Sequence, residues 1–118
     1  MAENTFGFHD ALNQAATVRS TAARADGSRL SFAVRSSGTA TGSWSVQYSN
    51  DFSPTLDDPT VDTKWDTYTL TSNPPDAAGS NQVFGVAIDN FEFTWARLKF
   101  TRTGGSGTAD VFTEVKGT

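Results

Sequence analysis

The sequence WARLKFTR at residues 95–102, followed by TGGSG at 103–107 and TADVFTEV at 108–115, decides the fold class. Apolar and polar side chains alternate along both arms, as in strands that bury one face and expose the other. The glycine-rich segment between the arms is typical of a tight turn. We therefore predict an antiparallel hairpin at 95–115. In its first arm, Ala96, Leu98 and Phe100 should share one face, and Trp95, Arg97 and Lys99 the other.

The same two-residue period recurs along most of the chain. Turn-forming residues separate further candidate strands, at residues 5–9, 15–22, 29–36, 43–50, 65–72 and 82–88. Asp26-Gly27 is a dipeptide that closes hairpins. Pro54 and Pro59 argue against a central strand, so 51–64 is predicted to be an exposed loop, and 73–80 a second loop. The best helical candidate is a single turn at 10–16, capped by Asp10.

These strands number about eight, with no internal repeat, heptad pattern or domain linker among them. We predict an all-β protein built as a two-sheet antiparallel sandwich, with a jelly roll as the favoured arrangement. An immunoglobulin-like sandwich is the alternative. Residues 1–14 are predicted to form an N-terminal arm or an edge strand, and residues 15–118 a single sandwich domain.

Composition excludes several classes of partner. The 118 residues carry a formal net charge of −4, and the nine Lys and Arg residues are scattered singly, which is a poor match for nucleic acid. Cysteine is absent, so no disulfide or thiolate metal site is expected, and a reducing cytoplasm suits the chain. No apolar run approaches the roughly 20 residues that span a bilayer, and the first residues lack a signal-peptide pattern. We expect a soluble, unprocessed protein without a membrane partner.

Catalytic motifs are missing from the sequence. The one histidine, His9, precedes Asp10, but adjacent strand residues point to opposite faces, so the pair does not form a dyad. No nucleophile elbow or phosphate-binding loop is present. We expect no enzymatic activity and no cofactor. Residues 51–66 hold five aspartates, which favour a solvated acidic loop, with a calcium site as the alternative.

The aromatic residues are the main indication of function. Trp44 is in phase with Val46 and Tyr48 and is predicted to lie in the core, whereas Trp95 is out of phase with the buried residues of its strand. Two interpretations of Trp95 remain open: packing within the domain, or a protein interface with Arg97 beside it. Exposed tryptophan rings would also suit stacking on sugars. The N-terminal aromatic residues either complete an edge strand or dock onto a neighbouring subunit.

Three segments resemble a pattern common in small virion proteins of tailed bacteriophages. They read GSWSVQYSND at 42–51, WDTYTLT at 65–71 and WARLKFTRTGGSGTADV at 95–111, and the match covers roughly residues 42–116. The resemblance implies a jelly-roll or related sandwich that serves as a capsid decoration (cement) protein or as a minor head or tail component, often as a trimer. This chain departs from the pattern by inserting residues 52–64 after Ser49-Asn50-Asp51.

The resemblance and the missing catalytic groups lead to one functional expectation. The chain is expected to be a non-enzymatic virion protein, assembled in the host cytoplasm, that stabilises the capsid by binding across subunit junctions. Its partners would be the major capsid protein or other virion proteins, together with further copies of itself. The alternatives are a carbohydrate-binding or host-adhesion module and a tail or minor head component. The candidate contact residues are Phe6, Phe8, Leu12, Phe52, Leu56, Trp95 and Arg97.

Overall fold

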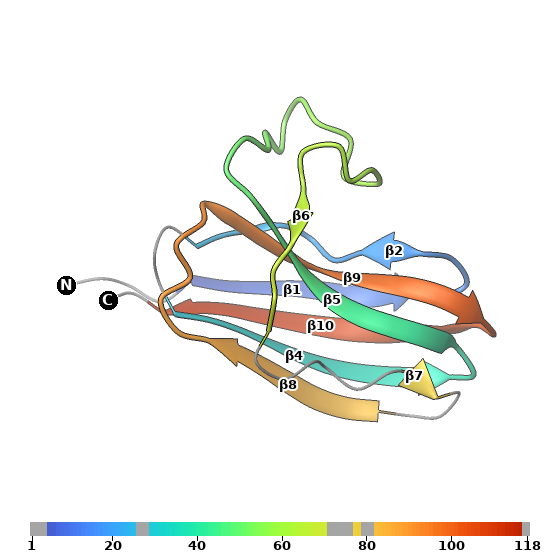
Figure 1. Cartoon of the computed structure of the whole chain (residues 1–118). Helices are drawn as coiled ribbons and strands as arrows, with labels where there is room; N and C mark the ends of the chain where they lie inside the picture. Colours follow the sequence, from blue (N-terminus) through green and yellow to red (C-terminus); the bar gives the residue numbers. More distant parts are fainter. Residues whose placement is uncertain (1–4, 26–28, 71–76, 79–81, 117–118) are drawn as a thin grey trace.

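The structure is a computed structural model that describes residues 5–25, 29–70, 77–78 and 82–116. These residues form strands and turns (Figure 1). No helix long and apolar enough to cross a bilayer occurs in the described part of the chain. The strands are β1 (Thr5–Asn13), β2 (Val18–Arg19), β3 (Ala23–Arg24), β4 (Arg29–Gly38), β5 (Thr41–Ser49), β6 (Asp66–Thr67), β7 (Ala77–Ala78), β8 (Gln82–Ile88), β9 (Trp95–Gly104) and β10 (Gly107–Lys116).

Two antiparallel sheets pack against each other. Sheet A has the order β1-β10-β4-β8, and sheet B has the order β2-β9-β5-β6, with β3 also pairing with β9 and β7 with β5. The prediction of an all-β, two-sheet antiparallel sandwich is confirmed. Figure 1 shows the segment between β5 and β6 rising from one end of the sandwich.

The connectivity is that of a jelly roll. β2 and β3 both pair with β9, so they act as one interrupted strand, and β6 and β7 both pair with β5 in the same way. Counted like this, the described residues form eight strands, and the successive long strands β4, β5, β8, β9 and β10 alternate between the two sheets. Two four-stranded sheets joined by such crossings form the double Greek key that defines a jelly roll.

The predicted hairpin at 95–115 is wrong. β9 pairs with β5 in sheet B, whereas β10 lies between β1 and β4 in sheet A, so the glycine-rich turn carries the chain from one sheet to the other. Asp26 and Gly27, where a hairpin turn was predicted, lie outside the described residues. The strands on either side of them, β3 and β4, belong to different sheets and do not pair. Period-2 alternation specifies which face of a strand is buried. A hairpin within one sheet and a crossing between two sheets can both turn the apolar faces toward the same core, so the alternation does not distinguish them.

The glycines are required where two sheet-crossing turns pack together. Gly105 has a φ of 67°, and a Cβ there would overlap the carbonyl oxygen of Thr39 in the turn between β4 and β5. The backbone N–H of Thr39 donates to the carbonyl of Ser106 at 2.7 Å. The glycine-rich segment therefore contacts the turn between β4 and β5.

The predicted strand phases are confirmed in the core. Ala96, Leu98 and Phe100 of β9 are completely buried, and Trp44 and Val46 of β5 pack with them. From sheet A the facing side chains are Leu30, Phe32, Val34, Ala109, Val111 and Val115. An aromatic cluster of Tyr48, Tyr68, Phe91 and Phe93 adjoins this core.

The N-terminal residues are part of the sandwich. β1 pairs with β10 from Thr5 opposite Val115 to Asn13 opposite Thr108, as an edge strand of sheet A. The expected helical turn at 10–16 is wrong, because residues 10–13 continue the strand past a bulge at Ala11, where φ is 52°. Of the strand predicted at 65–72, residues 71–72 lie outside the described residues, and the described part forms only the short strand β6. Most of the predicted loop at 73–80 lies outside the described residues, although Ala77–Ala78 form β7.

Candidate protein-binding surfaces

A buried arginine holds the segment between β5 and β6, residues 50–65, against sheet B. Arg97 projects from the outer side of β9, but this segment covers it and leaves 1% of its surface exposed. Its Nε donates to Gln47 Oε1 at 2.8 Å, Nη1 to the Pro59 carbonyl at 2.8 Å, and Nη2 to the Val61 carbonyl at 3.0 Å. The guanidinium carbon lies 4.0 Å from the centre of the Trp65 ring. We call residues 50–65 the anchored loop.

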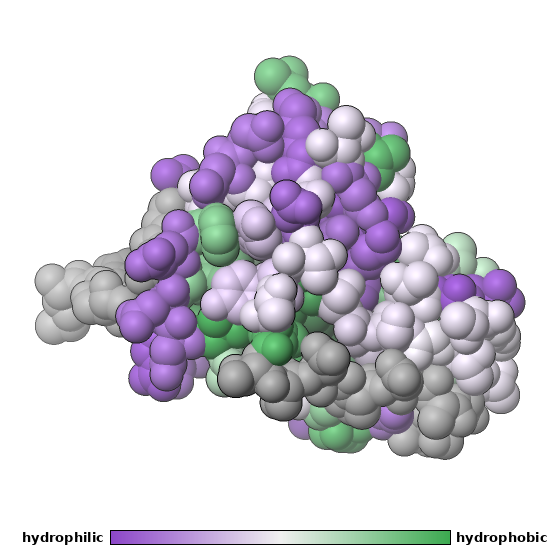
Figure 2. All heavy atoms as spheres, viewed as in Figure 1, coloured by the Kyte–Doolittle hydropathy of each residue, from purple (hydrophilic) through white to green (hydrophobic). Residues whose placement is uncertain are grey.

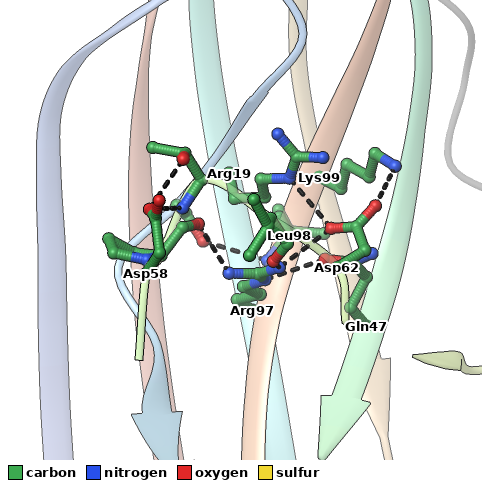
Figure 3. A network of polar contacts seen from close by, with 11 residues as sticks. Arg19, Gln47, Asp58, Asp62, Arg97, Leu98 and Lys99 are labelled. Carbon is green, nitrogen blue, oxygen red and sulfur yellow. Dashed lines mark hydrogen bonds and ion pairs between the residues drawn. The ribbon is translucent and has the colours of Figure 1, made fainter. Parts of the chain in front are cut away.

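Asp62 joins the anchored loop to three cations, as Figure 3 shows. Its Oδ1 accepts from Arg19 Nε and Arg97 Nη2, each at 3.0 Å, and its Oδ2 accepts from Lys99 Nζ. Burial disfavours the charged carboxylate, but hydrogen bonds from Arg19, Lys99 and Gln47 outweigh it and hold the pKa of Asp62 well below its usual range. Burial lowers the pKa of Arg97 to about 10 against the attraction of Asp62, so its guanidinium stays charged at neutral pH.

Two further aspartates, Asp57 and Asp58, accept hydrogen bonds from other residues of the loop. Asp57 accepts from Lys64 Nζ at 2.8 Å and from the Ser53 N–H, and Asp58 accepts from the Thr60 N–H at 2.9 Å. These hydrogen bonds lower the pKa of both carboxyl groups. No three His, Asp or Glu side chains gather as a metal-ligand set among the residues that the structure describes. The acidic residues therefore shape an ordered loop.

The apolar residues of the anchored loop divide into two groups. Phe52 and Trp65 are buried beneath it, with ring centres 5.0 Å apart, and Phe52 also meets the edge of Trp95 at 5.8 Å. Leu56 points away from the sandwich and is 86% exposed, and Val61 is exposed as well. Hydrophobic spheres appear at the tip of the projecting loop in Figure 2, on an otherwise largely hydrophilic surface.

A second apolar surface covers the outer side of sheet A. Phe6 is 71% exposed, Phe8 53%, Phe112 40% and Val83 79%. The Phe8 and Phe112 rings stack with their centres 4.6 Å apart, and the Arg35 guanidinium lies 5.8 Å from the centre of the Phe112 ring. We call this surface the outer face of sheet A.

The sequence-based contact residues divide according to exposure. Phe6, Phe8 and Leu56 are exposed, so their role in contacts stays a prediction. The expectation that Leu12, Phe52 and Arg97 would be exposed for contact is wrong. Leu12 faces the core between the sheets, Phe52 packs under the anchored loop, and Arg97 is covered by that loop. Trp95 is half-buried against Phe52, which is packing within the domain.

Sequence reasoning missed three exposed apolar residues, namely Val61, Val83 and Phe112. The signal for Phe112 was available, because it alternates with the buried Val111 and Thr113. Val83 lies in a nearly continuous apolar strand, where the alternation gives no phase.

A groove of about 580 Å³ lies between β1, residues 17–22 and the anchored loop. His9 lies on it, and its Nδ1 accepts from the Thr21 N–H at 3.0 Å. Arg97 also contributes to the groove, but its guanidinium is occupied by the contacts described above. Most of the surface exposed in the groove is apolar, and its three cationic or titratable side chains, His9, Arg19 and Arg97, already join segments of the fold.

The tryptophans are placed poorly for sugar stacking. Trp44 lies in the core as predicted, 5.0 Å from Phe100 between ring centres. Trp65 is buried, with Arg97 on its face. Trp95 is half-buried. Trp44 and Trp65 are therefore closed to a sugar, and Trp95 exposes only part of its surface.

Comparisons with known proteins return little. No known protein family matches this sequence, and no curated protein matches it. Among solved structures, the fold is similar to a chain in the structure of infectious bursal disease virus, Gx strain, with a TM-score of 0.49 and 9% sequence identity. The similarity covers 99% of this chain and 33% of that chain, so this chain spans about a third of its length. The function must therefore be inferred from the sequence and surfaces of the chain itself.

Proposed function

We propose that this chain is a non-enzymatic structural protein of a virion, most specifically a capsid decoration protein that binds other virion proteins. The sequence resemblance to small virion proteins of tailed bacteriophages supports this proposal, and the jelly-roll fold agrees with what that resemblance implies. The ionisable side chains with the densest contacts, Arg97 and Asp62, hold a loop in place. The proposal requires no chemical step.

The observation that carries the proposal is the anchored loop. It contains the 52–64 insertion that distinguishes this chain from the pattern it resembles. Three cations of the sandwich, one of them the buried Arg97, contact Asp62 and hold the loop in place. The loop presents Leu56 and Val61 to the surroundings. A loop already fixed in one conformation loses little entropy on binding, so its exposed apolar residues favour association with another protein.

Binding to capsid shells tests the proposal. Purified chain is mixed with shells assembled from the major capsid protein of the same virus, and co-sedimentation is measured. The double variant Leu56→Ser/Val61→Ser should lose at least about tenfold in affinity, since truncating buried interface anchors costs more than 1 kcal/mol each. Thr55→Ser is the matched control, because it changes a polar residue beside Leu56, and it should bind like the unchanged chain.

Thermal unfolding of all three proteins should be unchanged, since the substituted side chains are exposed. Shells that do not bind the unchanged chain, or that bind the double variant equally well, would contradict the proposal. Deleting residues 1–12 is a less informative experiment, because β1 is paired with β10 along its length and its loss would damage the sandwich.

A further inference from the structure

The outer face of sheet A is complementary to itself. We infer that it binds a second copy of this chain, in a face-to-face dimer whose two-fold axis runs parallel to the strands, between β10 and β4. The inference does not depend on the proposed function, because it concerns the opposite sheet from the anchored loop.

The first observation is the order of side-chain sizes across the sheet. One cross-strand row reads Phe8, Phe112, Ala33 and Gly85, from β1 through β10 and β4 to β8. The neighbouring outward row reads Phe6, Glu114, Ser31 and Ala87. In these two rows the aromatic residues lie on the β1–β10 half of the face, and small residues lie on the β4–β8 half.

The proposed axis places the large side chains of one copy opposite the small side chains of the other. It exchanges β10 with β4 and β1 with β8 while it keeps each row at its own height. Phe112 of one copy then lies over Ala33 of the other, and Phe8 lies over Gly85. Twisted sheets pack at about −30°, which displaces the outer strands by about one residue and leaves the rows beside the axis in place. Each large side chain thus meets a small one.

The second observation is the distribution of charge. Asp110 on β10 and Arg35 on β4 share the next outward row. Asp110 Oδ1 accepts from the Ala11 N–H at 2.9 Å, and Arg35 has no carboxylate partner among the described residues. The axis places Asp110 of each copy over Arg35 of the other, twice per dimer. An isologous interface requires this reciprocity.

The end of the face is compatible with the same arrangement. Lys116 shares a row with Arg29, so the axis brings these two cations together. Each already has its own carboxylate, Glu114 at 3.5 Å from Lys116 and Asp89 at 2.7 Å from Arg29. The contact lies at the rim, where solvent screens the repulsion.

The third observation is area. Four strands spaced about 4.8 Å apart and about eight residues long give roughly 500 Å² of flat surface per copy. The two copies together bury about twice this flat area, and side chains that project from the sheet add to it. The total buried area therefore reaches the roughly 1,000 Å² expected of a biological interface. A face that exposes two stacked phenylalanine rings and Val83 to water gains free energy from this burial.

Sedimentation velocity of the full chain tests the dimer. The unchanged chain should sediment at twice its 12.6 kDa mass. Asp110→Arg and Arg35→Asp should each sediment as monomers when alone, because each places like charges opposite one another twice, and the dissociation constant should rise about 100-fold or more. Mixed in equal amounts, the two variants should form a dimer, since every opposed pair then carries opposite charges.

The mixing experiment identifies the axis, because no other pairing of the two faces opposes residues 110 and 35 reciprocally. Leu56→Ser, on the anchored loop, should remain a dimer, which separates this inference from the proposed function. Circular dichroism should show that each variant is folded. An unchanged chain that sediments as a monomer or a trimer would contradict the dimer, and a mixture that stays monomeric would contradict the axis.

Discussion

At the scale of single residues, the most unusual feature of this molecule is the burial of the charged side chain of Arg97. A buried guanidinium is costly to desolvate, and it is tolerated here because two carbonyls, an amide oxygen and a carboxylate accept four hydrogen bonds from it. Arg29 offers a contrast within the same chain. Its Nε lies 2.7 Å from Asp89, but both side chains are mostly exposed.

The two arginines should therefore differ sharply when each is truncated. Arg97→Ala should lower the free energy of unfolding by about 3–5 kcal/mol, because Asp62 loses a buried partner and two loop carbonyls lose their donors. Arg29→Ala should lower it by at most about 1 kcal/mol. Chemical denaturation of both variants measures the difference. Equal losses would mean that Arg97 is not the residue that anchors the loop.

The ionisation of Asp62 makes the free energy of unfolding depend on pH in the acid range. Its pKa is lowered in the folded state, so the unfolded chain binds a proton more readily, and the contribution of Asp62 to stability is complete above about pH 4. That contribution should be lost as the pH falls below about 4. Replacing Asp62 with Asn removes this ionisation, so the variant should start less stable at neutral pH and lose less stability on acidification.

Urea unfolding of the unchanged chain and Asp62→Asn, from neutral pH down to about pH 2, checks this expectation. Asp57 and Asp58 also have lowered pKa values, but they titrate in both proteins and cancel in the comparison. Parallel losses of stability in the two proteins would refute the assigned role of Asp62.

At the scale of elements, the sequence predicted strands well and connections poorly. The period-2 pattern of β4, β5 and β9 is a local property that places Phe32, Val46 and Leu98 in the core, as observed. Whether β9 and β10 form a hairpin or cross between sheets depends on distant partners, and alternation looks the same in both cases. Packing, rather than local pattern, decided that connection.

The anchored loop shows the same limit. Proline and aspartate content predicted an exposed loop, and residues 52–64 do lie outside the sheets. The contacts that order the loop join Arg97 to residues 35 to 38 positions away, and no local pattern reports such pairs. The alternation along β9 predicted Arg97 at the surface. The side chain does lie on the outer side of the strand, but the anchored loop covers it.

The crossing between β9 and β10 should be intolerant of a side chain at Gly105. Its positive φ and the nearby Thr39 carbonyl leave no room for a Cβ, so Gly105→Ala should destabilise the fold by at least about 1–3 kcal/mol. Ser106→Ala, one residue along and exposed, should change stability by less than about 0.5 kcal/mol. Thermal unfolding of the two variants separates them. An unperturbed Gly105→Ala would show that this turn is not packed as described.

At the scale of the whole molecule, the two apolar surfaces lie on opposite sides of the sandwich. The anchored loop covers the outer side of sheet B, and the exposed phenylalanines cover the outer side of sheet A. A dimer formed through sheet A would present two anchored loops in opposite directions. Such a particle is bivalent, and a bivalent particle gains affinity when its loops bind two subunits at the same time.

Electron cryomicroscopy of capsid shells incubated with the purified chain shows whether the exposed apolar side chains of this rigid β scaffold bind other virion proteins. We expect density for the sandwich at subunit junctions, with residues 52–64 against the shell. Bare shells, or bound sandwiches whose anchored loops face only solvent, would refute this mode of binding.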